Sequence, residues 1–192
     1  MNYKIKTNIL TFALGITTFL FISCNVLLPK EIKELEKVEI FSVSKNKKSI
    51  LLDGVINSSA LYKFKFIANE NPKIKRIEIK NCDGSINDKI NLELAKYIYD
   101  NKYDIHLLDN GLIASGGTDL FLAGMQRTKG SNTKIGVHSW AGRGKTATNF
   151  PVGHKHHLPY INYYVSVGFT QKKQKISITL PSMRLLQILF TG

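Results

Sequence analysis

A chain of 192 residues with 43% hydrophobic residues can bury one sizeable core but is too short for two large domains. Its formal charge is +13, from 27 Lys and Arg against 14 Asp and Glu, and such a surplus can favour nucleic acid or anionic lipid. Because no compact patch of basic and aromatic residues is visible, we expect solvated lysines and no nucleic-acid partner.

The N-terminus has the three-part layout of a bacterial secretion signal. Lys4 and Lys6 precede an apolar run over residues 9–22, and the segment Phe21-Ile22-Ser23-Cys24 resembles a lipobox, in which the cysteine is diacylated before cleavage. We therefore expect a lipoprotein-type signal peptide at 1–23 and lipidation of Cys24. An uncleaved membrane anchor and an ordinary signal peptide are the alternatives.

This N-terminus sets the expected organisation and compartment of the rest of the chain. Residues 24–37 mix Pro29 with alternating Lys and Glu and suit a tether or short helix, and residues 38–192 form one domain. We expect this domain on the periplasmic side of a bacterial cell envelope, anchored to the membrane. With Cys24 acylated, Cys82 has no partner for a disulfide.

Apolar spacing and turn residues predict alternating strands and helices along the domain. Strands are expected at 38–43, 49–56, 74–79, 104–108 and 134–140. Helices are expected at 58–69, 88–101 and 118–125, and a turn at Asn110-Gly111 leads into a short apolar stretch at 112–115. This order requires β-α-β crossovers, so the predicted fold class is α/β with a mostly parallel sheet. Such sheets carry their sites at the carboxyl ends of the strands.

Three residues near that edge could carry chemistry. Gly84 lies in a strand-to-helix loop, where free N–H groups can face an anion. Ser115 opens a helix within Ala114-Ser115-Gly116-Gly117, and His138 ends the next strand. A serine hydroxyl becomes a nucleophile when a neutral imidazole accepts its proton and backbone donors hold the oxyanion. The structural alternatives are a helix N-cap for Ser115 and a core histidine for His138.

Taken together, the motifs from residue 50 to about residue 140 resemble the ClpP/crotonase superfamily, of the periplasmic or lipid-anchored ClpP-like type. The matching pieces, in chain order, are the opening strand 50–56, Asn69-Glu70-Asn71-Pro72 with 76–79, Cys82-Asp83-Gly84-Ser85 in place of a Pro-Gly-Gly-Ser loop, Ala114-Ser115-Gly116-Gly117 in place of an Ala-Ser-x-Gly turn, Phe121-Leu122-Ala123-Gly124 with Arg127, and Ile135-Gly136-Val137-His138. Asp83 departs from the family glycine.

The resemblance implies a serine hydrolase, most simply a peptidase. Ser115 would be the nucleophile, His138 the general base and then acid, and the N–H groups of Gly84 and Gly116 the oxyanion hole. It also implies peptide or protein substrates, no cofactor, and assembly into a homo-oligomer. An acyl-CoA activity of the crotonase type does not fit a domain outside the cytoplasm.

The triad acid of the family, which follows the histidine, has no counterpart here. No acidic residue occurs in the 73 positions after Asp119, whereas ten Lys and Arg do. This favours the alternative function, a non-catalytic envelope lipoprotein that keeps the fold as a binding or assembly module. Together with the apolar end at 185–190, it also makes a truncated or frame-shifted C-terminus an alternative to a naturally short variant.

Two further motifs are weaker. Gly142-Arg143-Gly144-Lys145-Thr146 has part of a phosphate-binding loop but Ser139 where that motif needs glycine, so we interpret it as an exposed basic loop. His154-Lys155-His156-His157 has the spacing of metal ligands, yet Lys155 would repel a cation and no carboxylate or cysteine follows. We expect no metal there, and a helix over 153–164 that packs over the site.

Overall fold

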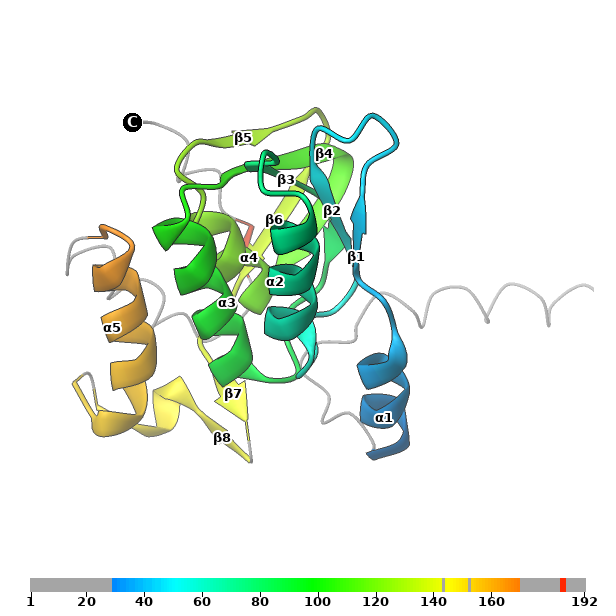
Figure 1. Ribbon diagram of the computed structural model, residues 1–192. Coiled ribbons are helices and arrows are strands. Elements are labelled where there is room, and N and C mark those ends of the chain that lie inside the picture. The colour runs from blue at the N-terminus through cyan, green and yellow to red at the C-terminus, as the bar shows by residue number, and fades with distance from the viewer. Residues whose placement is uncertain (1–28, 143, 152, 170–183, 186–192) are drawn as a thin grey trace, which may run out of the picture.

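The computed structural model describes residues 29–142, 144–151, 153–169 and 184–185 (Figure 1). The predicted signal peptide, the lipidation site Cys24 and nearly all of the apolar C-terminal stretch lie outside these residues. Within them, no helix combines the length and the apolar content that crossing a bilayer requires.

Helices and strands alternate as the sequence predicts. In chain order they are α1 (Pro29–Lys37), β1 (Phe41–Val43), β2 (Ile50–Asp53), α2 (Ala60–Glu70), β3 (Arg76–Cys82), α3 (Asp88–Asp100), β4 (Asp104–Ala114), α4 (Gly116–Leu122), β5 (Arg127–Lys129), β6 (Lys134–Val137), β7 (Ala141–Gly142), β8 (Lys145–Thr146), 3-10 turns at Ala147–Asn149 and Lys155–His157, α5 (Leu158–Ser166) and β9 (Arg184–Leu185). The mixed α/β class is thereby confirmed.

The main sheet has the order β1-β2-β3-β4-β6-β9, with β5 also paired to β4. β2, β3, β4, β5 and β6 are parallel, while β1 and β9 pair antiparallel at the two edges. Figure 1 shows α2, α3 and α4 side by side in front of this sheet. The β-α-β crossovers that the sequence predicts therefore place the carboxyl ends of β3, β4 and β6 at one edge.

The core lies between the sheet and these helices. Alternate residues of the central strands point inward, so that Ile77 and Ile79 of β3 are fully buried, as is Leu107 of β4. Phe64 of α2 is also fully buried and makes edge contacts with the rings of Phe41 and Tyr103, each at a centroid distance of 5.3 Å. Burial of each such side chain contributes about 1.5–3 kcal/mol.

The predicted turn at Asn110-Gly111 is wrong, because β4 continues through it as one strand. Asn110 has a positive φ of 58°, and the pairing of β3 with β4 shifts register between Ile79 and Asn81. The first half of β4 pairs with β5 and the second half with β6. A Cβ on Gly111 would lie 2.7 Å from the Leu108 carbonyl oxygen, so glycine permits this kink without ending the strand.

Candidate functional site

The sheet brings the three predicted site segments to the same edge. Ala114 pairs with Gly136, and Cys82 pairs with Ile113, so β3, β4 and β6 end in register. Ser115 directly follows the end of β4. Gly84 and His138 follow the ends of β3 and β6 by two residues and one residue, respectively.

Ser115 has a strained backbone. Its φ of 51° and ψ of −126° lie outside the regions that L-residues ordinarily adopt. The Ser115 N–H donates to the Gly136 carbonyl at 3.2 Å, which holds the residue beside β6. Although Ser115 occupies the N-cap position of α4, its hydroxyl makes no capping hydrogen bond, so the N-cap alternative does not account for it. Such strain at a sheet edge is typical of a functional residue.

Gly84 lies directly against the Ser115 side chain. It has a φ of 142°, and a Cβ placed on it would lie 3.1 Å from Ser115 Cβ. The Gly84 carbonyl accepts the Ile56 N–H at 2.9 Å. Neither the Gly84 N–H nor the Gly116 N–H donates a hydrogen bond to any residue that the structure describes. Within the part of the chain that the structure describes, two backbone donors beside Ser115 therefore have no acceptor.

The two glycines after Ser115 allow α4 to begin this close to β3. A Cβ on Gly116 would lie 2.6 Å from Ser85 Oγ, and one on Gly117 would lie 2.4 Å from the Cys82 carbonyl oxygen. Any larger residue at either position would push α4, and Ser115 with it, away from the sheet edge. The buried Asn91 donates from Nδ2 to the Gly116 carbonyl at 3.1 Å and holds this first turn in place.

His138 is half-buried, which does not fit the core-histidine alternative. Its Nδ1 lies 2.6 Å from the Ser139 carbonyl oxygen. Because a carbonyl can only accept, Nδ1 carries a proton in this contact, and Nε2 is the nitrogen that remains for a second partner. With the ring neutral, this is the tautomer that a general base needs. The Ser139 carbonyl thus holds the His138 ring, although it carries no negative charge as a triad carboxylate would.

Among the described residues, no hydrogen bond joins the Ser115 hydroxyl to the His138 ring. Contacts of this kind are often long in unliganded sites and shorten when substrate binds. The structure therefore places the two side chains at one sheet edge without forming the catalytic hydrogen bond.

Cys82 is the other nucleophilic side chain near this edge. Burial raises the pKa of its thiol to about 12, and its Sγ lies 3.7 Å from the Gly84 carbonyl oxygen. The thiol thus stays protonated near neutral pH, and a protonated, fully buried thiol is inert. Ser115 is the better nucleophile of the two.

Sequence reasoning did not identify Asp119 as part of the site. Asp119 lies one helical turn after Ser115, and its N–H donates to the Ser115 carbonyl at 3.3 Å. The Tyr164 hydroxyl donates to its Oδ1, and the Tyr163 hydroxyl to its carbonyl oxygen, both at 2.5 Å. Burial, opposed by the Tyr164 hydrogen bond and reinforced by the charge of Asp88, raises the pKa of the Asp119 carboxyl to about 7. The signal that the sequence offered for Asp119 was its position as the last acidic residue of the chain.

The helix α5 is attached to the site through a second carboxylate. Tyr160 donates to Asp88 Oδ2 at 2.5 Å, and Ser85 Oγ donates to Asp88 Oδ1 at 2.8 Å. The helix predicted over 153–164 is present as α5, which starts at residue 158 and ends at residue 166, and its tyrosines bind the first turn of α3 and the helix α4. α5 therefore contacts the helix that Ser115 begins, and it is linked to the Gly84 loop through Asp88 of α3.

The histidine segment that precedes α5 is part of the protein's packing. His157 is fully buried; its Nδ1 accepts from Trp140 Nε1 at 3.0 Å, and its Nε2 lies 3.1 Å from the Pro151 carbonyl. Both ring nitrogens are thus used in structural hydrogen bonds. No group of three or more His, Cys, Asp or Glu residues in the described part of the chain is arranged to hold a metal ion.

The glycine-rich basic segment forms the small hairpin β7-β8, in which Ala141 pairs with Thr146. A phosphate-binding loop instead joins a strand to a helix whose N–H groups face the phosphate. The basic-loop interpretation therefore fits this segment better.

Comparison with known proteins gives matches only among solved structures, since no family model and no curated protein matches the chain. A ClpP1 variant from Listeria monocytogenes superimposes with a TM-score of 0.52 and 17% identity, over 74% of this chain and 84% of that one. The ClpP protease catalytic domain from Plasmodium falciparum gives 0.49 and 19% identity, over 73% and 78%.

A third match is the membrane-bound stomatin-specific protease 1510-N in complex with a substrate peptide, with a TM-score of 0.45 and 17% identity. This likeness covers 68% of the present chain but only 62% of that protease. Identities this low establish the fold alone, and the Listeria ClpP1 match carries that conclusion.

Proposed function

We propose that this chain, which has the ClpP/crotonase-like fold, is a serine hydrolase that cleaves peptide bonds, with Ser115 as nucleophile and His138 as general base. The observation that carries the proposal is the strained backbone of Ser115 beside Gly84 at the carboxyl edge of the sheet. A conformation that costs energy, at a serine whose hydroxyl caps no helix, is explained if the hydroxyl must be presented to a substrate.

In the proposed reaction, His138 Nε2 takes the Ser115 hydroxyl proton while Oγ attacks the scissile carbonyl carbon. The carbonyl oxygen becomes an oxyanion, which the N–H groups of Gly84 and Gly116 stabilise. The tetrahedral intermediate collapses with loss of the amine, which receives the proton from His138 Nε2. Water, deprotonated by the same nitrogen, then hydrolyses the acyl-enzyme and restores the serine.

The missing triad acid sets the expected rate. The Ser139 carbonyl favours the required tautomer of His138 but adds no charge to stabilise the imidazolium that forms. Turnover should therefore lie well below that of a complete triad, and formation of a covalent adduct is a better readout than peptide turnover.

Reaction with a fluorophosphonate probe tests the proposal. The wild-type protein should form a covalent adduct, and Ser115→Ala should form none. Ser131→Ala is the matched control, because Ser131 is an exposed serine of the loop that enters β6 at the end opposite His138, and it should label like wild type. Absence of labelling in folded wild-type protein would favour the non-catalytic binding module instead.

We further propose that the chain is exported and held on the periplasmic side of the envelope by a lipid on Cys24, and that it forms a homo-oligomer. The first part rests on the N-terminal sequence. Labelled fatty acid fed to producing bacteria should be incorporated into the wild-type protein and into Cys82→Ala, but not into Cys24→Ala. Incorporation into Cys24→Ala would contradict the assignment.

A further inference from the structure

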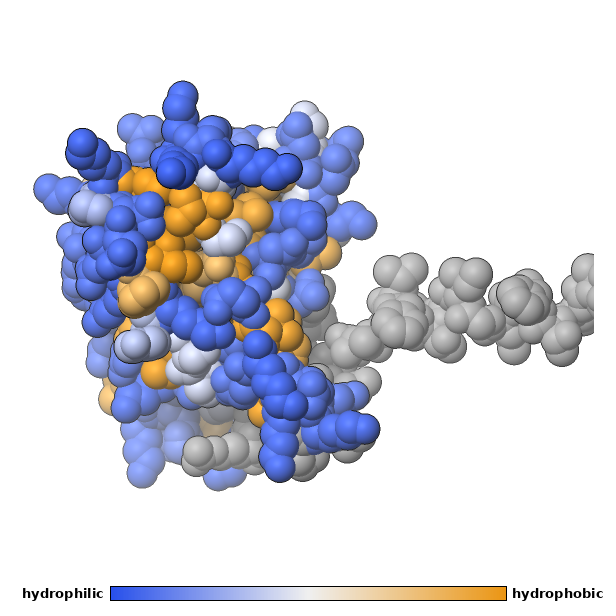
Figure 2. All heavy atoms as spheres, turned by 45° about the vertical axis from the view of Figure 1, so that its right-hand side comes forward, coloured by the Kyte–Doolittle hydropathy of each residue, from blue (hydrophilic) through white to orange (hydrophobic). Residues whose placement is uncertain are grey.

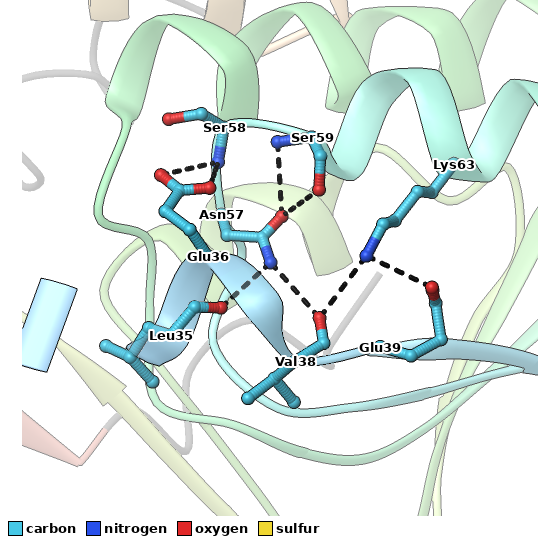
Figure 3. A network of polar contacts seen from close by, with 8 residues as sticks. All are labelled: Leu35, Glu36, Val38, Glu39, Asn57, Ser58, Ser59 and Lys63. Carbon is cyan, nitrogen blue, oxygen red and sulfur yellow. Dashed lines mark hydrogen bonds and ion pairs between the residues drawn. The ribbon is translucent and has the colours of Figure 1, made fainter. Parts of the chain in front are cut away.

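The helix α1 is joined to the domain by a network of polar contacts, although the sequence suits a simple tether. Its centre is Asn57, whose side chain is completely buried. Asn57 Nδ2 donates to the Leu35 carbonyl at 3.0 Å and to the Val38 carbonyl at 3.2 Å (Figure 3). Asn57 Oδ1 accepts from both the N–H and the hydroxyl of Ser59. Both N–H groups of this buried amide are thus used. The carbonyls that accept them belong to Leu35 of α1 and to Val38, the residue after α1.

Three charged side chains complete the attachment. The Glu36 carboxylate accepts the Ser58 N–H, with distances of 2.9 and 3.2 Å to its two oxygens. Lys63 of α2 forms an ion pair with Glu39 at 3.0 Å and reaches the Val38 carbonyl at 3.5 Å. Figure 3 shows Glu36 at the loop that joins β2 to α2, and Lys63 reaching from α2 to the segment that joins α1 to β1.

The same loop is bonded to the Gly84 loop. The Ile56 N–H donates to the Gly84 carbonyl at 2.9 Å, and the Ile86 N–H donates to the Ile56 carbonyl at 3.0 Å. The Asn87 side chain adds a hydrogen bond to the Ser58 hydroxyl at 3.1 Å. A continuous series of hydrogen bonds therefore runs from α1, through residues 56–58, to the Gly84 carbonyl and to Ile86 and Asn87 just after it.

Among the residues that the structure describes, few apolar contacts hold α1 itself. Of residues 30–37, Leu35 and Glu36 are half-buried and the others are exposed, including Ile32 at 38%. The face that carries α1 and α2 comes forward in Figure 2, where hydrophilic side chains surround patches of apolar surface. A short helix held mainly by polar contacts opens at a small fraction of the global unfolding free energy. When α1 leaves, Asn57 keeps a buried amide without acceptors, so the loop at 56–58 must rearrange as well.

We propose that α1 positions the Gly84 loop: with Asn57 and Glu36 as positioning residues, its docking fixes the oxyanion donor beside Ser115, and its release loosens that donor. The role of Gly84 as an oxyanion donor rests on the proposed function, whereas the coupling of α1 to the Gly84 loop does not. Because residues 1–28 run directly into α1, whatever binds or anchors them acts on the site through this helix.

Amide hydrogen exchange in the full-length protein tests the coupling with a matched pair of variants. Glu36→Ala removes the contact with Ser58, whereas Glu34→Ala removes only the exposed pair with Lys37 inside the same helix. Exchange at the Ile56 and Ile86 amides should become about fivefold faster in Glu36→Ala and stay unchanged in Glu34→Ala. The Leu107 amide in the core should not change in either variant, which separates local loosening from global unfolding.

Fluorophosphonate labelling of the same proteins gives the functional readout. Labelling should slow in Glu36→Ala and not in Glu34→Ala. Unchanged exchange at Ile56 and Ile86 in Glu36→Ala overturns the coupling, whatever the labelling shows. Faster exchange in a protein that never labels keeps the coupling and overturns the hydrolase.

Discussion

Ser115 concentrates the strain of the site at one residue, and glycine is the only residue that relaxes a backbone with φ of 51°. At an ordinary helix N-cap, Gly is already preferred to Ala by about 1 kcal/mol. Here we expect a larger difference, with Ser115→Gly more stable than Ser115→Ala by about 2–3 kcal/mol, because Gly also relieves the backbone strain. Urea denaturation of the two variants measures the difference. A difference no larger than about 1 kcal/mol would show that the backbone at this position is not strained.

Gly117 gives a second prediction at the scale of the residue, because its missing side chain lets α4 touch β3. In Gly117→Ala the new Cβ would lie 2.4 Å from the Cys82 carbonyl, so we expect a loss of about 2–3 kcal/mol despite the better helix propensity of Ala.

Gly144→Ala is the comparison for this prediction. Gly144 has a φ of +72° but no neighbour within 4 Å, so its replacement should cost only about 1 kcal/mol. Equal unfolding free energies for the two variants would contradict the steric role of Gly117.

At the scale of the element, α5 depends on the carboxyl groups of Asp88 and Asp119. The folded protein holds the Asp119 proton up to about pH 7, whereas the unfolded chain loses it near 3.8. Ionisation is therefore disfavoured in the folded state, and stability falls as the pH rises from about 4 to about 7. Above that range the full cost of the buried charge is present.

Asp119→Asn should remove this pH dependence while its side chain can still accept from Tyr164. The gain in stability of the variant over wild type should therefore be larger at pH 8 than at pH 5. Urea midpoints at the two pH values measure the effect. An equal difference at both values would show that Asp119 titrates as it does in the unfolded chain.

The elements themselves were largely predictable from local sequence. Helical spacing placed α2 and α3 within two residues of their observed starts, because their buried positions recur every three or four residues. α4 begins two residues before the predicted start, at Gly116, since the turn at Ser115 and its close packing outweigh the low helix propensity of two glycines. β5 was missed because all three of its side chains are exposed and leave no apolar pattern.

At the scale of the whole molecule, the order of elements was enough to predict the parallel sheet and to bring Gly84, Ser115 and His138 to one edge. Contacts between distant residues were not predictable in this way. Tyr164 and Asp119 are 45 residues apart, and Asn57 lies 22 residues from Leu35, with no periodicity that links them. The contact of His138 with the Ser139 carbonyl also depends on how the chain leaves β6.

The most direct test of the account is the rate and position of fluorophosphonate modification in His138→Ala, with His106→Ala as control, since His106 is bound to Thr128 on β5. If Ser115 is activated by His138, peptide mapping should place the adduct on Ser115 in wild type and in His106→Ala. The rate should drop by at least about a hundredfold in His138→Ala. An adduct on another serine, or an unchanged rate in His138→Ala, would contradict the account.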